Sequence, residues 1–187
     1  MSFTGEERVL IDGTLRGARA GASFETINPA TEEVLGVAAD CDLADLDDAI
    51  GAARRAFDEG PWPRMMPKER AKRLRAVADR LVAEREVFAE LESRDTGKPI
   101  SQARTDADVA ARYFEFYAGV VEGVHGDTIP AIAGVLAYTL REPLGVTAHI
   151  EPWNYPLQIG CRTLAPALVM GNCAVLKPAE EAPLSLL

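Results

Sequence analysis

Two short polar segments, at the ends of two apolar runs, have residue types that could bind and activate a small molecule. Asn154 follows the apolar run 144–150, whereas Lys177 ends the run 173–177 and Glu180 follows it. An asparagine amide could stabilise a developing oxyanion. The lysine could donate, and the glutamate accept, hydrogen bonds with a ribose diol. The simpler alternatives are a helix cap for the asparagine and plain solvation for the charged pair.

The elements that must position these residues are predicted by the local pattern. The run 144–150 reads as a buried strand that ends at Pro152, and 156–170 has helical spacing before Gly171. With the second strand at 173–177, this is a βαβ unit, whose loops lie at the carboxyl ends of parallel strands. Neither strand is followed by a glycine-rich phosphate loop, so a nucleotide site would be built in another way.

The rest of the chain is predicted to hold small strands, a helical middle and one isolated strand. The predicted strands are 9–11 and 14–15 around an Asp-Gly turn, 24–27, 34–37, and 135–140 after a loop at 126–130. The predicted helices begin after Asp42, at Pro67 and after Ser101, with a further helical stretch ending at Gly97. Their expected apolar stripes are Leu46, Ile50, Ala53 and Phe57; Leu74, Val77 and Leu81; Val87, Phe88 and Leu91; and Val109, Tyr113, Phe116 and Val120.

Composition bounds the class of protein. The chain has 187 residues, 48% hydrophobic and 26% charged, as in globular proteins, and a net charge of -9 argues against nucleic-acid or anionic-membrane partners. Cys41, Cys161 and Cys173 are an odd set without disulfide or metal spacing, which favours a reducing compartment. Residues 1–8 lack a signal-peptide pattern and no apolar run reaches membrane-spanning length. We therefore expect a soluble cytoplasmic protein.

Two parallel strands do not make a stable sheet, because such sheets need more strands and covered faces. The helix indicated by residues 183–187 ends on leucines. We therefore expect this chain to be the front part of a longer α/β protein.

Motifs along nearly the whole chain resemble the NAD(P)-dependent aldehyde dehydrogenase superfamily. The segments that carry the resemblance are Ile11–Gly13, Thr26–Thr31, Asp95–Pro99, Arg141–Val146, Pro152–Leu157, Ala165–Leu168, Gly171–Asn172 and Lys177–Glu180. Residues 25–30 and 154–159 are most similar to betaine-aldehyde-type members. The resemblance implies the N-terminal part of the aldehyde dehydrogenase fold: a helical segment and the first βαβ unit of a Rossmann-like sheet, with an isolated oligomerisation-type strand. The implied division is 1–124, 125–143 and 144–187, within a homodimer or homotetramer.

The resemblance also assigns roles to residues. Asn154 matches the asparagine that stabilises the oxyanion together with the backbone N–H of the nucleophile. The implied cofactor-binding residues are Ile150, Glu151, Pro152, Trp153, Asn154, Lys177, Pro178, Ala179 and Glu180. The carboxylate of Glu180 disfavours a 2′-phosphate, so NAD is expected over NADP. A monovalent cation is expected near Thr26, Ile27, Asp95 and Glu181. Turn capping is the alternative for those four positions.

The chain also departs from the family pattern. The resemblance implies that the nucleophilic cysteine and the general-base glutamate lie downstream of Leu187. None of the cysteines present is expected to replace the nucleophile, since Cys161 lies in the crossover helix, Cys173 begins a strand and Cys41 precedes a helix. His125 and His149 are expected to be structural.

A second departure is Thr163, which stands where many members, including the betaine type, have a lysine, and it weakens the betaine-aldehyde assignment. The expected activity of the complete protein is oxidation of an aldehyde substrate to a carboxylic acid with reduction of NAD(P). The alternatives are a non-catalytic remnant or subunit-interaction fragment, and an NADP-dependent semialdehyde dehydrogenase.

Overall fold

The computed structural model of the protein describes residues 8–187. The sequence-based expectation that residues 1–8 are not a signal peptide concerns residues that, apart from Arg8, lie outside the described part of the chain. The elements in chain order are β1 Val9–Ile11, β2 Thr14–Arg16, β3 Ser23–Ile27, β4 Val34–Ala39, α1 Leu43–Asp58, α2 Pro67–Ala83, α3 Arg85–Thr96, α4 Ile100–Val120, η1 Val121–Gly123, β5 Thr128–Ile129, β6 Ala137–Tyr138, β7 Val146–Ile150, α5 Pro156–Val169, β8 Cys173–Lys177 and η2 Leu184–Leu186.

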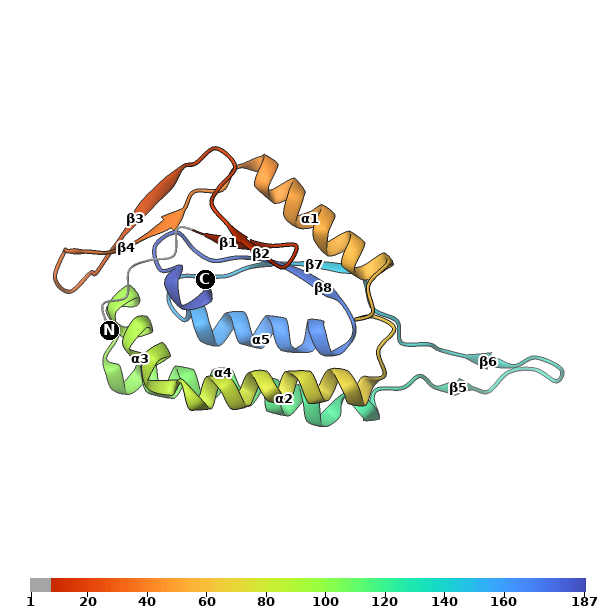
Figure 1. The fold of residues 1–187 in the computed structure, drawn as a ribbon. Helices are drawn as coiled ribbons and strands as arrows, with labels where there is room; N and C mark the ends of the chain where they lie inside the picture. Colours follow the sequence, from red (N-terminus) through yellow and green to blue (C-terminus); the bar gives the residue numbers. More distant parts are fainter. Residues whose placement is uncertain (1–7) are drawn as a thin grey trace.

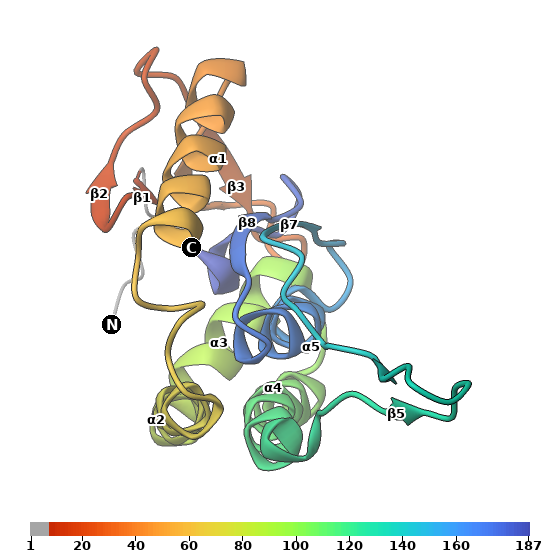
Figure 2. The ribbon, with the colours of Figure 1, turned by 90° about the vertical axis from the view of Figure 1, so that its right-hand side faces the viewer.

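The elements stack in layers around the two parallel strands. Helix α1 lies on one side of β7 and β8, α5 lies on the other, and α2 and α4 form the layer beyond α5 (Figure 1). The view turned by 90° about the vertical axis shows the same order of layers (Figure 2). The main apolar core lies where α2, α4 and α5 meet, and includes Leu74, Phe114 and Leu157.

The predicted βαβ unit is confirmed. Strands β7 and β8 are parallel and stay in register from Val146 opposite Cys173 to Ile150 opposite Lys177. Gly171, at φ 94°, lets the chain turn out of α5, a backbone conformation that glycine adopts without strain.

Asn172 then links the two ends of the crossover. Its Oδ1 accepts a hydrogen bond from the Gly145 N–H at 3.0 Å, and its Nδ2 donates one to the Ala167 carbonyl at 2.9 Å. The start of β7, the end of α5 and the start of β8 are therefore held together by one side chain.

Most helix boundaries follow the predicted local signals. Asp42 caps α1 through a reciprocal capping box with Asp45, Pro67 opens α2, and Gly97 at φ 77° ends α3. The prediction that Ser101 caps the next helix is wrong, because α4 already begins at Ile100 with Pro99 in the cap position. A proline there has a fixed φ and no N–H that would need a partner.

The predicted buried stripes were less accurate. On α4 the side chains packed into the core are mainly alanines, whereas Phe116 is 54% and Val120 is 40% exposed. Leu46, Ile50 and Val77, also expected inside, are exposed too. Small residues let helix backbones approach closely, so the contact face of α4 is its alanine face and not its bulky face.

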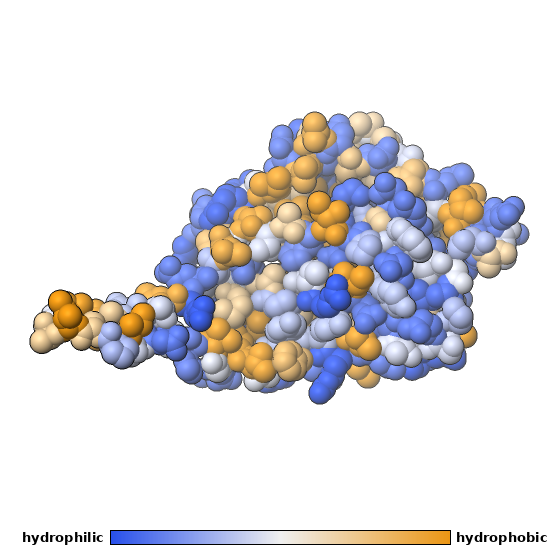
Figure 3. All heavy atoms as spheres, turned by 180° about the vertical axis from the view of Figure 1, so that it is seen from behind, coloured by the Kyte–Doolittle hydropathy of each residue, from blue (hydrophilic) through white to orange (hydrophobic). Residues whose placement is uncertain are grey.

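A long arm between α4 and β7 leaves the body of the molecule (Figure 1). The strand predicted over 135–140 is shorter, Ala137–Tyr138, and it pairs antiparallel with β5, which lies inside the segment predicted as a loop. Asp127 N–H donates to Thr139 Oγ1 at 2.9 Å, and Thr139 N–H donates to the Asp127 carbonyl. Apolar side chains gather along the arm (Figure 3), where Leu136 is 77% exposed. No helix within residues 8–187 is long and apolar enough to cross a membrane.

Candidate functional site

The loop that carries Asn154 leaves the carboxyl end of β7 and leads into α5. Glu151 N–H still bonds to the Lys177 carbonyl at 3.0 Å, so the loop begins where the ladder ends. The Asn154 side chain is exposed and makes no hydrogen bond to any described residue, and the cap position of α5 belongs to Tyr155. The capping alternative for Asn154 is therefore not realised, and its amide is free to donate to a ligand.

Lys177 and Glu180 lie at the same edge of the sheet, after β8. Lys177 Nζ is 3.1 Å from Glu180 Oε2 and also donates to the Pro178 carbonyl at 3.0 Å. The pKa of Glu180 is below its ordinary value, because its own backbone N–H and then Lys177 stabilise the carboxylate. Exposed pairs of this kind add little to stability. The pair therefore presents a donor and an acceptor, side by side, to solvent.

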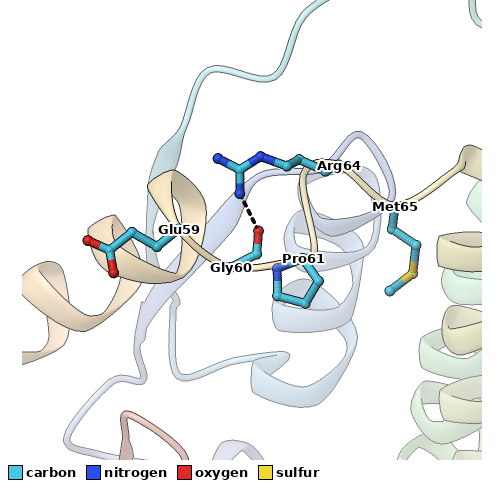
Figure 4. Close-up of a pocket in the computed structure, with 5 residues that line it drawn as sticks. All are labelled: Glu59, Gly60, Pro61, Arg64 and Met65. Carbon is cyan, nitrogen blue, oxygen red and sulfur yellow. Dashed lines mark hydrogen bonds between the residues drawn. The ribbon is translucent and has the colours of Figure 1, made fainter.

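Asn154 lines a cavity of about 270 Å³ against the turn between α3 and α4. The lining residues are Thr96, Gly97, Lys98, Gln102, Trp153, Asn154 and Tyr155. A larger cavity of about 490 Å³ lies at the turn between α1 and α2 (Figure 4). There Arg64 donates to the Gly60 carbonyl at 2.9 Å while Glu59 extends away from it, so the cavity gathers no set of groups for acid–base work.

Glu151, at the start of the Asn154 loop, is 4% exposed. Its Oε1 accepts a hydrogen bond from Thr163 Oγ1, and its Oε2 has no partner among the described residues. Nearby His149 is buried and bonded through Nε2 to Thr147 Oγ1 at 2.8 Å; burial lowers its pKa, although Glu151 acts in the opposite direction. These contacts give His149 a structural role in the body of the sheet.

The four residues predicted to bind a cation differ in their surroundings. Asp95 is 2% exposed, accepts from Leu184 N–H at 2.8 Å through Oδ2, and leaves Oδ1 without a partner in the part of the chain that is described. Burial, and then Glu92, raises the pKa of Asp95 to about 7 against the bond from Leu184. Thr26 is buried and bonds to the Gly36 carbonyl, whereas Ile27 and Glu181 are exposed. Within residues 8–187, no three His, Cys, Asp or Glu side chains converge as a metal cluster.

None of the three cysteines has the setting of a nucleophile. Burial, followed by Glu92 and Glu151, raises the pKa of Cys161 to about 12. Partial burial also raises the pKa of Cys173, and partial burial followed by Asp45 raises the pKa of the mostly exposed Cys41. Because the thiolate is the reactive form, these shifts suppress reactivity.

One charged cluster beside the site was missed from the sequence. Lys98 Nζ lies 3.0 Å from Glu92 Oε1 and 2.7 Å from Asp106 Oδ2, and 4.5 Å from the centre of the Tyr155 ring. The signal that could have revealed it is Asp106, which shares helical spacing with the buried alanines at 103, 107 and 110.

Comparisons with known proteins agree with this geometry. The model of the aldehyde dehydrogenase family matches residues 17–187. Aldehyde dehydrogenase family 2 member B4 of Arabidopsis thaliana is 43% identical over 179 residues, covering 95% of this chain and 33% of its own length. Benzaldehyde dehydrogenase of Antirrhinum majus is 42% identical, covering 97% and 34%.

Solved structures give the same result. Betaine aldehyde dehydrogenase of Staphylococcus aureus, crystallised with NAD+, superposes with a TM-score of 0.94 at 36% identity, covering 97% of this chain and 37% of that one. An indole-3-acetaldehyde dehydrogenase superposes with a TM-score of 0.95 at 37% identity, covering 98% and 42%.

The architecture is thus that of the N-terminal part of the aldehyde dehydrogenase fold. The chain belongs to the aldehyde dehydrogenase family. It spans about a third of the length of the curated relatives it matches.

Proposed function

We propose that the complete protein carrying this chain oxidises an aldehyde to a carboxylic acid while reducing NAD. The observation that carries the proposal is the parallel register of β7 and β8, which brings Asn154 and the Lys177–Glu180 pair to one edge of the sheet. In this proposal the Asn154 amide donates a hydrogen bond to the oxyanion that forms when the aldehyde is attacked. The nucleophile and the general base are supplied from outside these 187 residues.

The residues at this edge fit a nicotinamide dinucleotide. Lys177 offers a donor and Glu180 an acceptor for the adenosine ribose, and Pro178 and Ala179 shape the loop between them. Ile150, Glu151, Pro152 and Trp153 are proposed to line the cofactor along the first loop; Ile150 and Trp153 are 79% and 57% exposed and thus accessible, whereas Glu151 is buried and contributes through its backbone. The bound dinucleotide supplies the hydride acceptor.

The carboxylate of Glu180 supports NAD over NADP, because it would repel a 2′-phosphate. In the complete protein, Glu180→Gln should lower KM for NADP with little change in KM for NAD. An unchanged ratio of the two KM values would remove this argument.

The proposal is tested on the complete coding sequence by following NADH absorbance with a panel of aldehydes, including betaine aldehyde and semialdehydes. Aldehyde-dependent reduction of NAD is expected. Reduction of NADP alone, with a semialdehyde, would instead support the semialdehyde dehydrogenase alternative. No reduction of either cofactor would favour a non-catalytic remnant or a subunit-interaction fragment.

A monovalent cation near Asp95 remains part of the proposal. The buried, unpartnered Oδ1 of Asp95 fits such an ion, and Thr26, Ile27 and Glu181 would supply further oxygens. Replacing Na⁺ or K⁺ by choline should lower the melting temperature of the wild type but not of Asp95→Asn.

We also propose that the arm pairs subunits in a homodimer or homotetramer, as one of three units spanning 1–124, 125–143 and 144–187. The exposed Leu136 and Tyr138 on the arm support this assembly. Leu136→Asp should shift the mass measured by light scattering towards the monomer. The net charge of -9 and the free cysteines support a cytoplasmic protein without nucleic-acid or membrane partners.

A further inference from the structure

The ammonium group of Lys98 is held in the protein interior directly behind the loop that carries Asn154. Its side chain is 10% exposed, and its two carboxylate partners, on Glu92 and Asp106, are 0% and 1% exposed. The third contact of the ammonium is the face of the Tyr155 ring, 4.5 Å from Nζ to the ring centre. Tyr155 directly follows Asn154 and occupies the cap position of α5.

Hydrogen bonds also hold the backbone of Lys98. Gly97 has φ 77°, and a Cβ there would lie 2.8 Å from the Pro29 Cγ, so this turn requires glycine. Ser93 Oγ donates to the Lys98 carbonyl at 2.7 Å. The Lys98 N–H donates to Thr96 Oγ1 at 3.3 Å. The Lys98 backbone is therefore held in one conformation, which directs its side chain towards Glu92 and Asp106.

One of the two carboxylates, that of Asp106, has a second donor, whereas Glu92 Oε2 has no partner among the described residues. Gln102 Nε2 donates to Asp106 Oδ1 at 2.9 Å, from the same face of α4. A buried cluster of one cation and two anions is a weak source of stability, because removing the charges from water offsets their attraction. What the cluster provides is a fixed and largely buried cation, and a cation of that kind binds an aromatic face more strongly than an exposed one does.

Among the described residues, the start of α5 has no side-chain hydrogen bond at its cap. Tyr155 makes no capping hydrogen bond, and Asn154 makes no hydrogen bond within residues 8–187. The cavity that Asn154 lines is also lined by Lys98 and Gln102. The ring contact is therefore the link between this loop and the charged cluster.

We propose that Lys98 is a positioning residue for Asn154: by holding the Tyr155 ring, it fixes the backbone from which the Asn154 amide is directed at the reacting oxygen. This inference rests on the proposed function. An oxyanion donor acts only if it is already in place when charge develops, so a loosened loop should lower kcat while leaving cofactor binding intact.

The test uses the complete protein and three variants. Tyr155→Leu removes the ring but leaves both ion pairs, Lys98→Met removes the cation, and Lys98→Arg keeps a cation. We expect Tyr155→Leu and Lys98→Met each to lower kcat by roughly 10-fold or more, with KM for NAD changed by less than about twofold. Lys98→Arg should retain most of the wild-type kcat. Arg112→Met, which removes an exposed ion pair with Glu115 on α4, is the control and should leave kcat unchanged.

A double-mutant cycle separates positioning from general damage. In an Asn154→Ala background, Tyr155→Leu should lower kcat by less than about twofold, because the amide that it positions is already gone. Equal losses in both backgrounds would overturn the inference. So would a kcat for Tyr155→Leu within about twofold of wild type. If Lys98→Met does not fold, Tyr155→Leu decides the question.

Hydrogen exchange provides a readout that does not depend on activity. The Ile159 amide, whose hydrogen bond to the Tyr155 carbonyl closes the first turn of α5, should exchange roughly tenfold faster in Tyr155→Leu than in wild type, while the amides of α2 stay unchanged. If the wild type reduces no cofactor, the proposed function fails, and exchange alone then decides whether the ring contact holds the loop. Unchanged exchange of the Ile159 amide would overturn the positioning role.

Discussion

Thr163 Oγ1 donates a hydrogen bond to Glu151 Oε1 at 2.5 Å, which joins α5 to the first residue after β7. Thr163 is the position at which the family resemblance led us to expect a lysine. The buried carboxylate at Glu151 has this hydroxyl as its side-chain donor among the described residues. Thr163 and Glu151 therefore form a buried hydrogen-bonded pair at the start of the loop that carries Asn154.

Thr163→Val should destabilise the complete protein, because both oxygens of a buried carboxylate would then lack a donor. The expected loss in free energy of unfolding is about 1–3 kcal/mol, measured by urea denaturation. Thr163→Ser keeps the hydroxyl and should lose much less. Equal midpoints for the wild type and Thr163→Val would show that the bond contributes nothing.

Asn154→Ala should lower kcat for aldehyde oxidation by about 10²–10³-fold, the usual effect of removing one oxyanion donor. The melting temperature should stay the same, since the side chain has no hydrogen bond within the described part of the chain. NAD affinity, measured by titration, should also be retained. A kcat within a few-fold of wild type would remove Asn154 from the reaction.

Asp45 should make stability depend on acid pH. Burial would raise the pKa of this carboxyl, but hydrogen bonds from Arg16 and from the backbone of Arg19 and Asp42 outweigh it, and the pKa lies below the ordinary value of 3.8. A group whose pKa is lower in the folded state stabilises above its unfolded pKa, and this stability is lost as pH falls through the folded value. Wild type should therefore exceed Asp45→Asn by about 1–3 kcal/mol at neutral pH.

Denaturation of wild type and Asp45→Asn at several pH values checks this expectation. The gap should shrink as pH falls below 3.8. Asp48→Asn, at a carboxylate whose side chain is 35% exposed, should give a smaller gap. A gap that widens in acid would contradict the assignment.

The cysteines should react in the order of their exposure. Iodoacetamide at pH 8 should label the exposed Cys41 first and Cys173 more slowly. Cys161, with its pKa at about 12, should stay unlabelled until the protein unfolds. Peptide mass spectrometry gives the three rates. Fast labelling of Cys161 that an aldehyde prevents would make it a candidate nucleophile after all.

The sequence predicted best what local signals determine. The βαβ unit is bounded by prolines and by Gly171, and its short strands are almost continuously apolar, so both strands and the loops after them were placed correctly. The faces of α4 could not be read in this way. Its buried alanines have little hydropathy, while Phe116 and Val120 gave a strong but misleading stripe, because which face is covered depends on α2 and α5.

The helical spacing of Asp106 could have marked that residue as buried, but the partners of Lys98 could not be predicted, for a different reason. These partners lie on α3, on α4 and at the start of α5, and none of the three contacts follows from spacing within one element. Only the structure shows that the Asn154 side chain does not cap α5, since an asparagine before a helix is normally its cap.

The Asn172 side chain aligns the first residues of the two parallel strands. Since β7 and β8 then each run five residues in step, the two loops emerge level with one another, whatever residues those loops contain. Loop sequences can therefore diverge between lineages, altering what is recognised, without any realignment of the strands beneath. Adding one residue to either strand would do the opposite, and would put the two loops out of step even if every residue in them were kept.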